Sequence, residues 1–192
     1  MKNNFYASLD SINSSIWENL VNATVKKNTP FNRPTLATIN KNKIKLRTMI
    51  LRKVDKEKKK LIFYTDRRSA KVNDIEENSQ VAIHFYDDKK KIQLICTGVS
   101  KLEYSSQNII KIWKSMPSHS KINYMSSLKP GANLDDKINN ILVNQDEALF
   151  NFSIIYVKIK TIDWLYLSRG RNQRAFFTYV KKNSFNAKWL VP

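Results

Sequence analysis

The feature that most constrains the fold is a series of short apolar runs separated by charged turns. Strand-like runs occupy residues 61–64, 81–86 and 92–104, and lysine-rich turns lie at 55–60 and 87–91. Runs of this length, rich in β-branched and aromatic residues, predict antiparallel strands. Further strands are expected over residues 35–39, 43–54, 152–167 (as two segments), 174–181 and 189–192. Six or more strands with inserted helices predict an α+β fold, mainly β, built as an antiparallel barrel with peripheral helices.

An amphipathic helix is expected at the N-terminus. Apolar residues recur at spacings of three and four from Leu9 to Leu20, with Ser8 or Asp10 as the cap, and the pattern ends near residues 27–28. Other helical segments are expected over residues 69–78, 105–114, 117–125 and 134–144, and Gly98 is expected to break its strand. No internal repeat or domain boundary is visible. Residues 1–192 are therefore expected to form one domain, with residues 1–28 as its N-terminal helix.

The formal net charge of +18 raises the question of a polyanionic partner, such as nucleic acid or an acidic membrane. The lysines lie in turns and are interspersed with acids, so we expect a solvated surface and no specific nucleic-acid partner. A basic nucleic-acid-binding protein is kept as a remote alternative. The N-terminus lacks the apolar region of a signal peptide, and no run approaches the roughly 18 apolar residues of a spanning helix. A cytoplasmic protein without a membrane partner is expected.

The single cysteine, Cys96, excludes a disulfide within this chain. It lies in an apolar run, and a nucleophilic cysteine needs a nearby base. With only two histidines in the chain, a buried structural thiol is the better interpretation. No metal site is expected.

Cations and hydroxyls gather in the stretch 46–71. Arg47 and Arg52 flank the apolar run 49–51, whereas Thr65, Ser69 and Lys71 follow the run 61–64 at the expected start of a helix. Backbone N–H groups at a helix start add donors for an anion. The pattern predicts a pocket for a phosphate-bearing ligand. The alternative is that these residues are ordinary solvated surface.

This stretch resembles the flavin-mononucleotide (FMN) motif of the pyridoxamine 5'-phosphate oxidase family. That family reads Arg-x-x-Leu-x-Lys, then Phe-Tyr-Thr-Asn, then Ser-x-Lys, and the matching residues here are Arg47, Ile50, Arg52, Phe63-Tyr64-Thr65-Asp66, Ser69 and Lys71. Later segments are also similar, namely Gln93 five residues before Gly98, Trp164 with Arg174 ten residues on, and Leu190-Val191-Pro192. The resemblance covers residues 35–192 and implies an FMN-binding split barrel, typically a homodimer with FMN at the subunit interface.

The resemblance also implies a set of FMN-binding residues. These are Arg47, Thr48, Met49, Ile50, Leu51, Arg52, Tyr64, Thr65, Ser69, Lys71, Gln93, Trp164 and Arg174. Arg47 and Lys71 would neutralise the phosphate. The backbone of residues 49–51 would line the flavin ring. Since the flavin carries the redox chemistry, no acid–base pair is required and no catalytic residue is assigned.

The departures from the family concern the substrate. The family's Tyr, Arg and Ser that bind substrate phosphate correspond to Ile112, Met116 and Ser120, its Arg-x-His corresponds to Gly170 and Asn172, and its lysine is Arg52. Ser120 is kept as a weak substrate-binding candidate, with Arg169 and Arg171 as substitutes for the lost cations. We therefore expect an oxidase-related branch of the family and an FMN-dependent oxidoreductase acting on an unidentified small molecule. The alternative is a non-catalytic flavin or haem carrier of the same fold, with His84 or His119 as candidate haem ligands.

Overall fold

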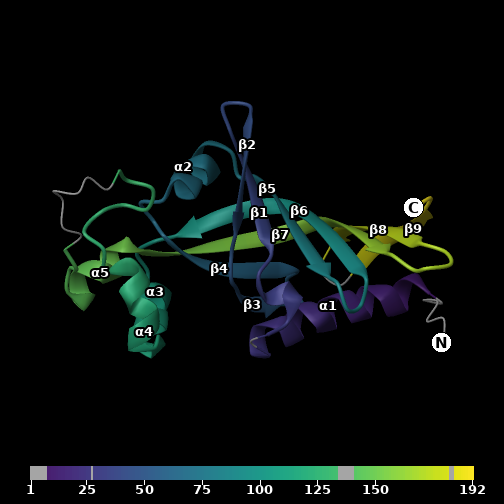
Figure 1. Ribbon diagram of the computed structural model, residues 1–192, viewed down its shortest axis with the longest axis horizontal. Helices are drawn as coiled ribbons and strands as arrows, with labels where there is room; N and C mark the ends of the chain where they lie inside the picture. Colours follow the sequence, from purple (N-terminus) through teal and green to yellow (C-terminus); the bar gives the residue numbers. More distant parts are fainter. Residues whose placement is uncertain (1–7, 27, 134–140, 182–183) are drawn as a thin grey trace.

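The computed structural model describes residues 8–26, 28–133, 141–181 and 184–192, in which nine strands form one antiparallel sheet (Figure 1). The strands are β1 (Thr35–Asn40), β2 (Lys43–Thr48), β3 (Leu51–Asp55), β4 (Lys60–Asp66), β5 (Gln80–Asp87), β6 (Ile92–Glu103), β7 (Phe152–Tyr166), β8 (Gln173–Lys181) and β9 (Ser184–Leu190). Their order is β2-β1-β5-β6-β7-β4-β3, with β8 paired to β7 and β9 paired to β8. This arrangement confirms the expected α+β, mainly β architecture.

Strand β7 organises the sheet. One of its edges pairs with β6 along its length, whereas its other edge pairs with β4 over residues 152–158 and with β8 over residues 161–166. The prediction of two separate segments over 152–167 is therefore wrong, because continuous pairing with β6 keeps β7 as one strand. Gly98 does not end β6 either. The register shifts there, and a Cβ on Gly98 would lie 2.3 Å from the Lys158 carbonyl oxygen, so a close backbone approach requires glycine.

The expected single strand over residues 43–54 is also wrong. Its first part, β2, pairs with β1, and its second part, β3, pairs with β4. The chain changes partner at Met49, whose N–H donates to the Pro34 carbonyl oxygen at 2.9 Å. Arg47 therefore lies on β2, at the opposite end of the strand order from the β3–β4 hairpin that carries Tyr64 and Thr65.

Helix α1 (Leu9–Val25) covers the main core and is capped by Ser8, whose Oγ accepts from Ser11 N at 3.2 Å. This helix confirms the N-terminal prediction, although it ends at Val25. Its buried face packs on the sheet, and Trp17 Nε1 donates to the Tyr179 hydroxyl at 3.0 Å. No helix in the described ranges is both long and apolar enough to span a membrane.

The other described helices are α2 (Ala70–Glu77), α3 (Gln107–Ser115), α4 (Ser118–Lys121) and α5 (Gln145–Asn151), with short 3₁₀ turns at Pro30–Asn32 and Ile122–Tyr124. Helices α3 to α5 gather at one end of the molecule, and α1 lies along the other (Figure 1). Trp113, Tyr124 and Phe152 form a second core between α3 and the ends of β4 and β7.

The helix expected over residues 134–144 is only partly testable, because 134–140 lie outside the described residues. Residues 141–144 are not helical, and Leu142 forms a β-bridge with Ser126. The helix begins instead at Gln145. Asn144 is its cap, and its side chain accepts from the N–H groups of Asp146 and Glu147, which fixes the start of α5.

Candidate functional site

Lys71 lies among hydroxyl groups at the start of α2. Its Nζ is 3.2 Å from Thr65 Oγ1 and 3.0 Å from Ser69 Oγ, and both hydroxyl residues are buried. No ion pair in the described part of the chain includes Lys71. Burial lowers the pKa of Lys71 and the positive charge of Arg47 lowers it further, while Asp66 and Asp74 raise it less. Thus the ammonium is paired with dipoles instead of a carboxylate and would be stabilised by an added anion.

Arg47 approaches the same place from β2. Its Nη1 donates to Thr38 Oγ1 at 2.7 Å, and its Nη2 donates to Asp74 Oδ2 at 3.3 Å. Lys45 Nζ donates to the other oxygen of Asp74 at 3.0 Å. Burial opposes the charge on Asp74, but hydrogen bonds from Thr38 and Lys45 and the charges of Lys45 and Arg47 hold the pKa of Asp74 below its ordinary value. Two cations, Lys45 and Arg47, therefore share one buried carboxylate, and Lys71 forms no ion pair with it.

Asp66 is close enough to raise the pKa of Lys71, but its carboxylate is paired with Arg68. Arg68 donates to it through Nε at 3.1 Å, through Nη2 at 2.7 Å and through its backbone N–H at 2.8 Å. The family motif has Asn at this position. In this chain the position is Asp66, and Arg68 neutralises its charge. We call Arg47, Thr65, Ser69 and Lys71 the anion site, and the structure brings these four predicted residues together.

The predicted residues between Arg47 and Arg52 alternate in burial. Thr48 and Ile50 are exposed, whereas Met49 and Leu51 are buried in the main core. The side chains of Met49 and Leu51 are therefore structural, and contact with a ligand would have to use their backbone groups, as the sequence predicted.

A second pocket, of about 190 Å³, lies beside α3. We call it the Arg52 pocket, and its lining residues are Arg52, Tyr64, Ile112, Ser115, Met116, Pro117 and Ser120. The Arg52 guanidinium carbon lies 5.6 Å from the centre of the Tyr64 ring. Burial raises the pKa of Tyr64, against the effect of Arg52, so its hydroxyl is a neutral donor at pH 7. The pocket brings Ser120 together with Ile112 and Met116, the two positions at which this chain departs from the family's substrate-binding residues.

The remaining predicted residues lie in a different part of the protomer. Gln93 and Arg174 are both register partners of Leu165 on β7, whereas Thr65 is the partner of Ser153. Twelve residues of strand separate these two points, which is about 40 Å along β7 at ~3.3 Å per residue. This exceeds the reach of one mononucleotide. A single protomer therefore does not bring the predicted FMN residues into one site.

The individual residues of this far group differ in exposure. Trp164 is only 1% exposed and packs in the main core beside Tyr166. Its side chain offers no surface for a ligand, so its expected contact with FMN is not supported by the fold of one chain. Arg174 is bound to Asp163 through Nε at 3.0 Å and Nη2 at 2.6 Å. Arg169 and Arg171 are exposed in the β7–β8 loop, far from Ser120.

The two candidate haem ligands are exposed, whereas the single cysteine is buried. His84 is exposed on β5 with Nε2 3.3 Å from Gln93 Oε1, and His119 is exposed on α4. The described residues contain no group of three or more His, Cys, Asp and Glu that could hold a metal ion. Cys96 is fully buried, as expected, and burial raises the pKa of its thiol far above the ordinary range, so it is not a nucleophile.

Sequence reasoning missed the supporting residues Thr38, Lys45 and Asp74. Two of them carry a usable signal. Lys45 is two residues before Arg47 and shares its face of β2, and Asp74 is three residues after Lys71 and shares its face of α2. Thr38 reaches Asp74 across 36 positions, and no local pattern indicates that contact.

The comparisons with known proteins agree with this geometry. Residues 14–103 match the family model described as "Pyridoxamine 5'-phosphate oxidase, FMN-binding domain". These residues are just under half of the chain, and over this segment the chain is similar to that family. The matched segment contains every residue of the anion site.

Among the curated proteins to which the chain is similar is the pyridoxine/pyridoxamine 5'-phosphate oxidase of Vibrio vulnificus. It is 32% identical over 94 residues, which are 48% of this chain and 43% of that protein. The match therefore spans less than half the length of that curated relative.

Solved structures show that the fold of the oxidase family extends over the rest of the chain. A pyridoxamine 5'-phosphate oxidase-related, FMN-binding protein of Nostoc punctiforme has a TM-score of 0.78 at 19% identity, covering 97% of this chain and all of that one. PhzG of Burkholderia lata, solved in complex with tetrahydrophenazine-1-carboxylic acid, has a TM-score of 0.71 at 16% identity and covers 93% of this chain and 91% of its own. These likenesses confirm the split-barrel fold.

Proposed function

We propose that this protein binds FMN with the phosphate in the anion site and acts as an FMN-dependent oxidoreductase on a small planar molecule. The observation that carries the proposal is the contact of Lys71, on α2, with the buried hydroxyls of Thr65 and Ser69. Arg47, on β2, lies close enough for its charge to lower the pKa of Lys71. The residues fall in the order of the family's FMN motif, and the family match includes all of them.

The donor set fits a phosphate. The Lys71 ammonium has hydroxyl partners but no carboxylate among the described residues, and the Arg47 charge repels it. A phosphate dianion would relieve that repulsion and accept charge-assisted hydrogen bonds from both cations. The start of α2 contributes its backbone N–H groups and the favourable end of the helix dipole.

In this proposal FMN supplies two-electron transfer, and the chain supplies binding and orientation. Arg47 and Lys71 hold the phosphate, while the hydroxyls of Thr65 and Ser69 fix its direction. Arg52 and the neutral Tyr64 hydroxyl hold a polar group of the substrate next to the apolar side chains of α3. None of these residues has to transfer a proton in the reaction.

The Arg52 pocket favours a substrate with a single negative charge. Arg52 is the one cation among its seven lining residues, and Ile112, Met116 and Pro117 form an apolar wall. A phosphate dianion would be poorly neutralised there, whereas a flat ring with one carboxylate would meet both the cation and the wall. PhzG, which was solved with an aromatic ring system bearing one carboxylic acid, is an example of this ligand class on the same fold.

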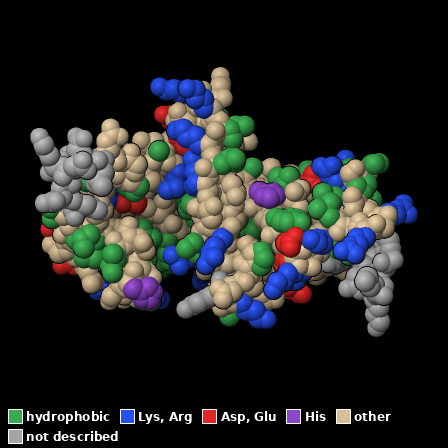
Figure 2. Space-filling model, viewed as in Figure 1, with side chains coloured by type: hydrophobic (Ala, Val, Ile, Leu, Met, Phe, Trp, Pro, Cys, Tyr) green, Lys and Arg blue, Asp and Glu red, His purple; other side chains and the backbone are tan. Residues whose placement is uncertain are grey.

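We further propose a homodimer with FMN at the subunit interface. The anion site and the group around Arg174 are about 40 Å apart along β7, so a second protomer would have to bring them together. The outer face of the sheet is also apolar. Ile39 and Ile44 are register partners, Leu46 follows on the same side, and all three are 39–71% exposed. Hydrophobic side chains interrupt the basic surface over the middle strands (Figure 2), as expected of an interface between subunits.

The test is a titration of the apoprotein with FMN and, in parallel, with riboflavin, followed by flavin fluorescence. Because the phosphate would contribute charge-assisted bonds, FMN should bind at least about tenfold more tightly than riboflavin. Equal affinities would contradict the anion site, and the absence of flavin binding would contradict the function. Anaerobic reduction of the loaded protein, followed by reoxidation with planar acceptors, then separates an oxidoreductase from a flavin carrier.

A further inference from the structure

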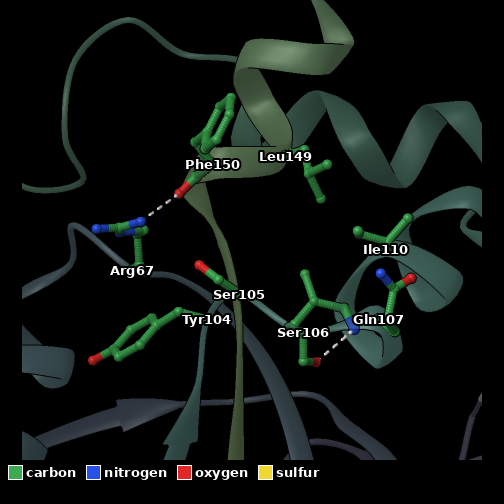
Figure 3. Close-up of a pocket in the computed structure, with 9 residues that line it drawn as sticks. Arg67, Tyr104, Ser105, Ser106, Gln107, Ile110, Leu149 and Phe150 are labelled. Carbon is green, nitrogen blue, oxygen red and sulfur yellow. Dashed lines mark hydrogen bonds between the residues drawn. The ribbon is translucent and has the colours of Figure 1, made fainter.

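We propose that a cavity on the opposite side of α3 from the Arg52 pocket binds a small apolar carboxylate. The cavity has a volume of about 380 Å³ and is lined by Arg67, Tyr104, Ser105, Ser106, Gln107, Ile109, Ile110, Leu149 and Phe150 (Figure 3). We call it the Arg67 pocket. Its volume is typical of sites for small organic ligands, and the proposal does not depend on FMN binding.

One wall of the pocket is apolar. Leu149 and Phe150 come from the end of α5, and Ile110 faces them from the first turns of α3 (Figure 3). Phe150 is 70% exposed. A large aromatic side chain that remains in water at the edge of a cavity gains from being covered by an apolar ligand.

Beside Phe150, the pocket carries the cation of Arg67 (Figure 3). Nη1 of Arg67 donates to the Phe150 carbonyl oxygen at 3.4 Å, and the guanidinium carbon lies 5.5 Å from the centre of the Tyr104 ring. No ion pair within the described ranges includes Arg67. A guanidinium has five N–H donors in a planar fork that matches a carboxylate. Most of these donors are therefore available to a ligand.

The nearest acids do not compete strongly for this site. Glu76 accepts from the Tyr104 hydroxyl, on the far side of the ring from the pocket, and Glu103 accepts from Ser106, Asn108 and Tyr156. With one cation and a largely apolar wall, the pocket is suited to one negative charge. A carboxylate on an aromatic or branched body fits this combination better than a phosphate dianion.

The pocket is separate from the site of the proposed reaction. Three α3 residues line the Arg67 pocket, namely Gln107, Ile109 and Ile110. A different set lines the Arg52 pocket, namely Ile112, Ser115 and Met116. A ligand in one pocket therefore contacts the same helix as a ligand in the other without touching the same residues.

The experiment uses 3-phenylpropionate as the probe and 3-phenylpropionamide as its neutral control, with ¹³C-labelled methyl groups observed by NMR at physiological salt. In the wild-type protein the methyl signals of Ile110 and Leu149 should shift saturably with the acid, and the amide should bind at least about tenfold more weakly. Arg67→Gln keeps a donor for the Phe150 carbonyl. It should weaken binding of the acid about tenfold and leave the affinity for the amide unchanged. Lys56→Gln, which removes an exposed cation in the β3–β4 turn, should change neither affinity.

Two outcomes would overturn the proposal. One is the absence of a saturable shift at Ile110 and Leu149 at millimolar probe. The other is equal affinity of the wild-type protein for acid and amide, a comparison that needs no variant and so cannot be confused with a folding defect. A third comparison tests the apolar wall, because Phe150→Ala should weaken acid and amide alike, and unchanged affinity for both would place the ligand elsewhere.

Discussion

Asp74 and Arg47 are joined both directly and through a third residue: Arg47 Nη2 lies 3.3 Å from Asp74 Oδ2, and Thr38 Oγ1 is 2.7 Å from each side chain. The carboxylate therefore orients the guanidinium of Arg47, and Lys45 shares its charge. This arrangement leaves Lys71 without an acidic partner of its own in the described residues. The anion site consists of an oriented arginine and an unneutralised lysine.

Replacing Arg47 with Ala should weaken FMN binding by about ten- to a hundredfold, because one charge-assisted partner of the phosphate is lost. The fold should survive, since Asp74 keeps Thr38 and Lys45 as donors. Fluorescence titration measures the affinity, and circular dichroism checks the fold. Lys56→Ala serves as the control at an exposed cation in the β3–β4 turn, and an unchanged FMN affinity in Arg47→Ala would show that the phosphate does not bind at this site.

Replacing Lys71 with Met should have opposite effects on the apoprotein and on FMN binding. The partly buried ammonium is disfavoured by burial and by Arg47, as the lowered pKa of Lys71 indicates. The free energy of unfolding of the apoprotein should therefore stay the same or rise, by about 0.5 kcal/mol, while FMN affinity falls about tenfold or more. Urea unfolding and flavin titration provide the two measurements. A clear loss of apoprotein stability would show that Lys71 is structural.

The stabilising effect of Asp74 should depend on pH. Its pKa is lowered in the folded state, so the ionised carboxylate adds stability above the ordinary Asp pKa of about 3.9, and this contribution is lost as the pH falls through the lower folded-state value. Asp74→Asn should therefore be less stable than wild type at pH 7, and the difference should shrink below about pH 4. Urea unfolding at several pH values measures it. A difference that stays constant down to pH 3 would assign the effect to packing.

Leu46→Asp should produce a monomer that retains little FMN, since it places a charge on the exposed apolar face of the sheet. Val25→Asp is a suitable control, because Val25 is 75% exposed at the end of α1, away from that face. Light scattering coupled to gel filtration gives the mass, and absorbance gives the flavin content. A wild-type monomer at micromolar concentration that carries one FMN per chain would contradict the interfacial site.

Pyridoxamine 5'-phosphate should be a poor substrate, with a kcat/KM well below ~10⁴ M⁻¹s⁻¹. The Arg52 pocket has Met116 at the position of a family arginine, and methionine offers neither a donor nor a charge. Met116→Arg should raise kcat/KM about tenfold or more, whereas Ile122→Arg, at an exposed site outside the pocket, should not. Efficient oxidation by the unaltered protein would show that another cation, such as Arg169 or Arg171, binds the substrate phosphate.

The sequence predicted the parts of the fold that depend on local pattern. Helix α1 with its Ser8 cap and strands β4 and β5 follow from periodicity and capping chemistry within a few residues. The change of partner between β2 and β3 does not, because it depends on a hydrogen bond from Met49 to Pro34 and on pairing with two different strands. Likewise, continuous β7 results from β6 on its other edge.

The candidate site divides in the same way. The ordered matches to the FMN motif predicted Arg47, Thr65, Ser69 and Lys71, which the fold brings together. The network behind them escaped prediction because Thr38 and Asp74 are distant in sequence. The Arg67 pocket could not be predicted either. It is assembled from the ends of β4, β6 and α5 and the start of α3, and no single segment carries its pattern.

The split edge of β7 has a consequence for how such a protein can diversify. Every side chain of the anion site and its supporting network comes from residues 38–74, whereas the group near Leu165 comes from residues 93–174. Recombination or drift in the later segment can therefore remodel one half of the proposed site while the phosphate half is inherited unchanged.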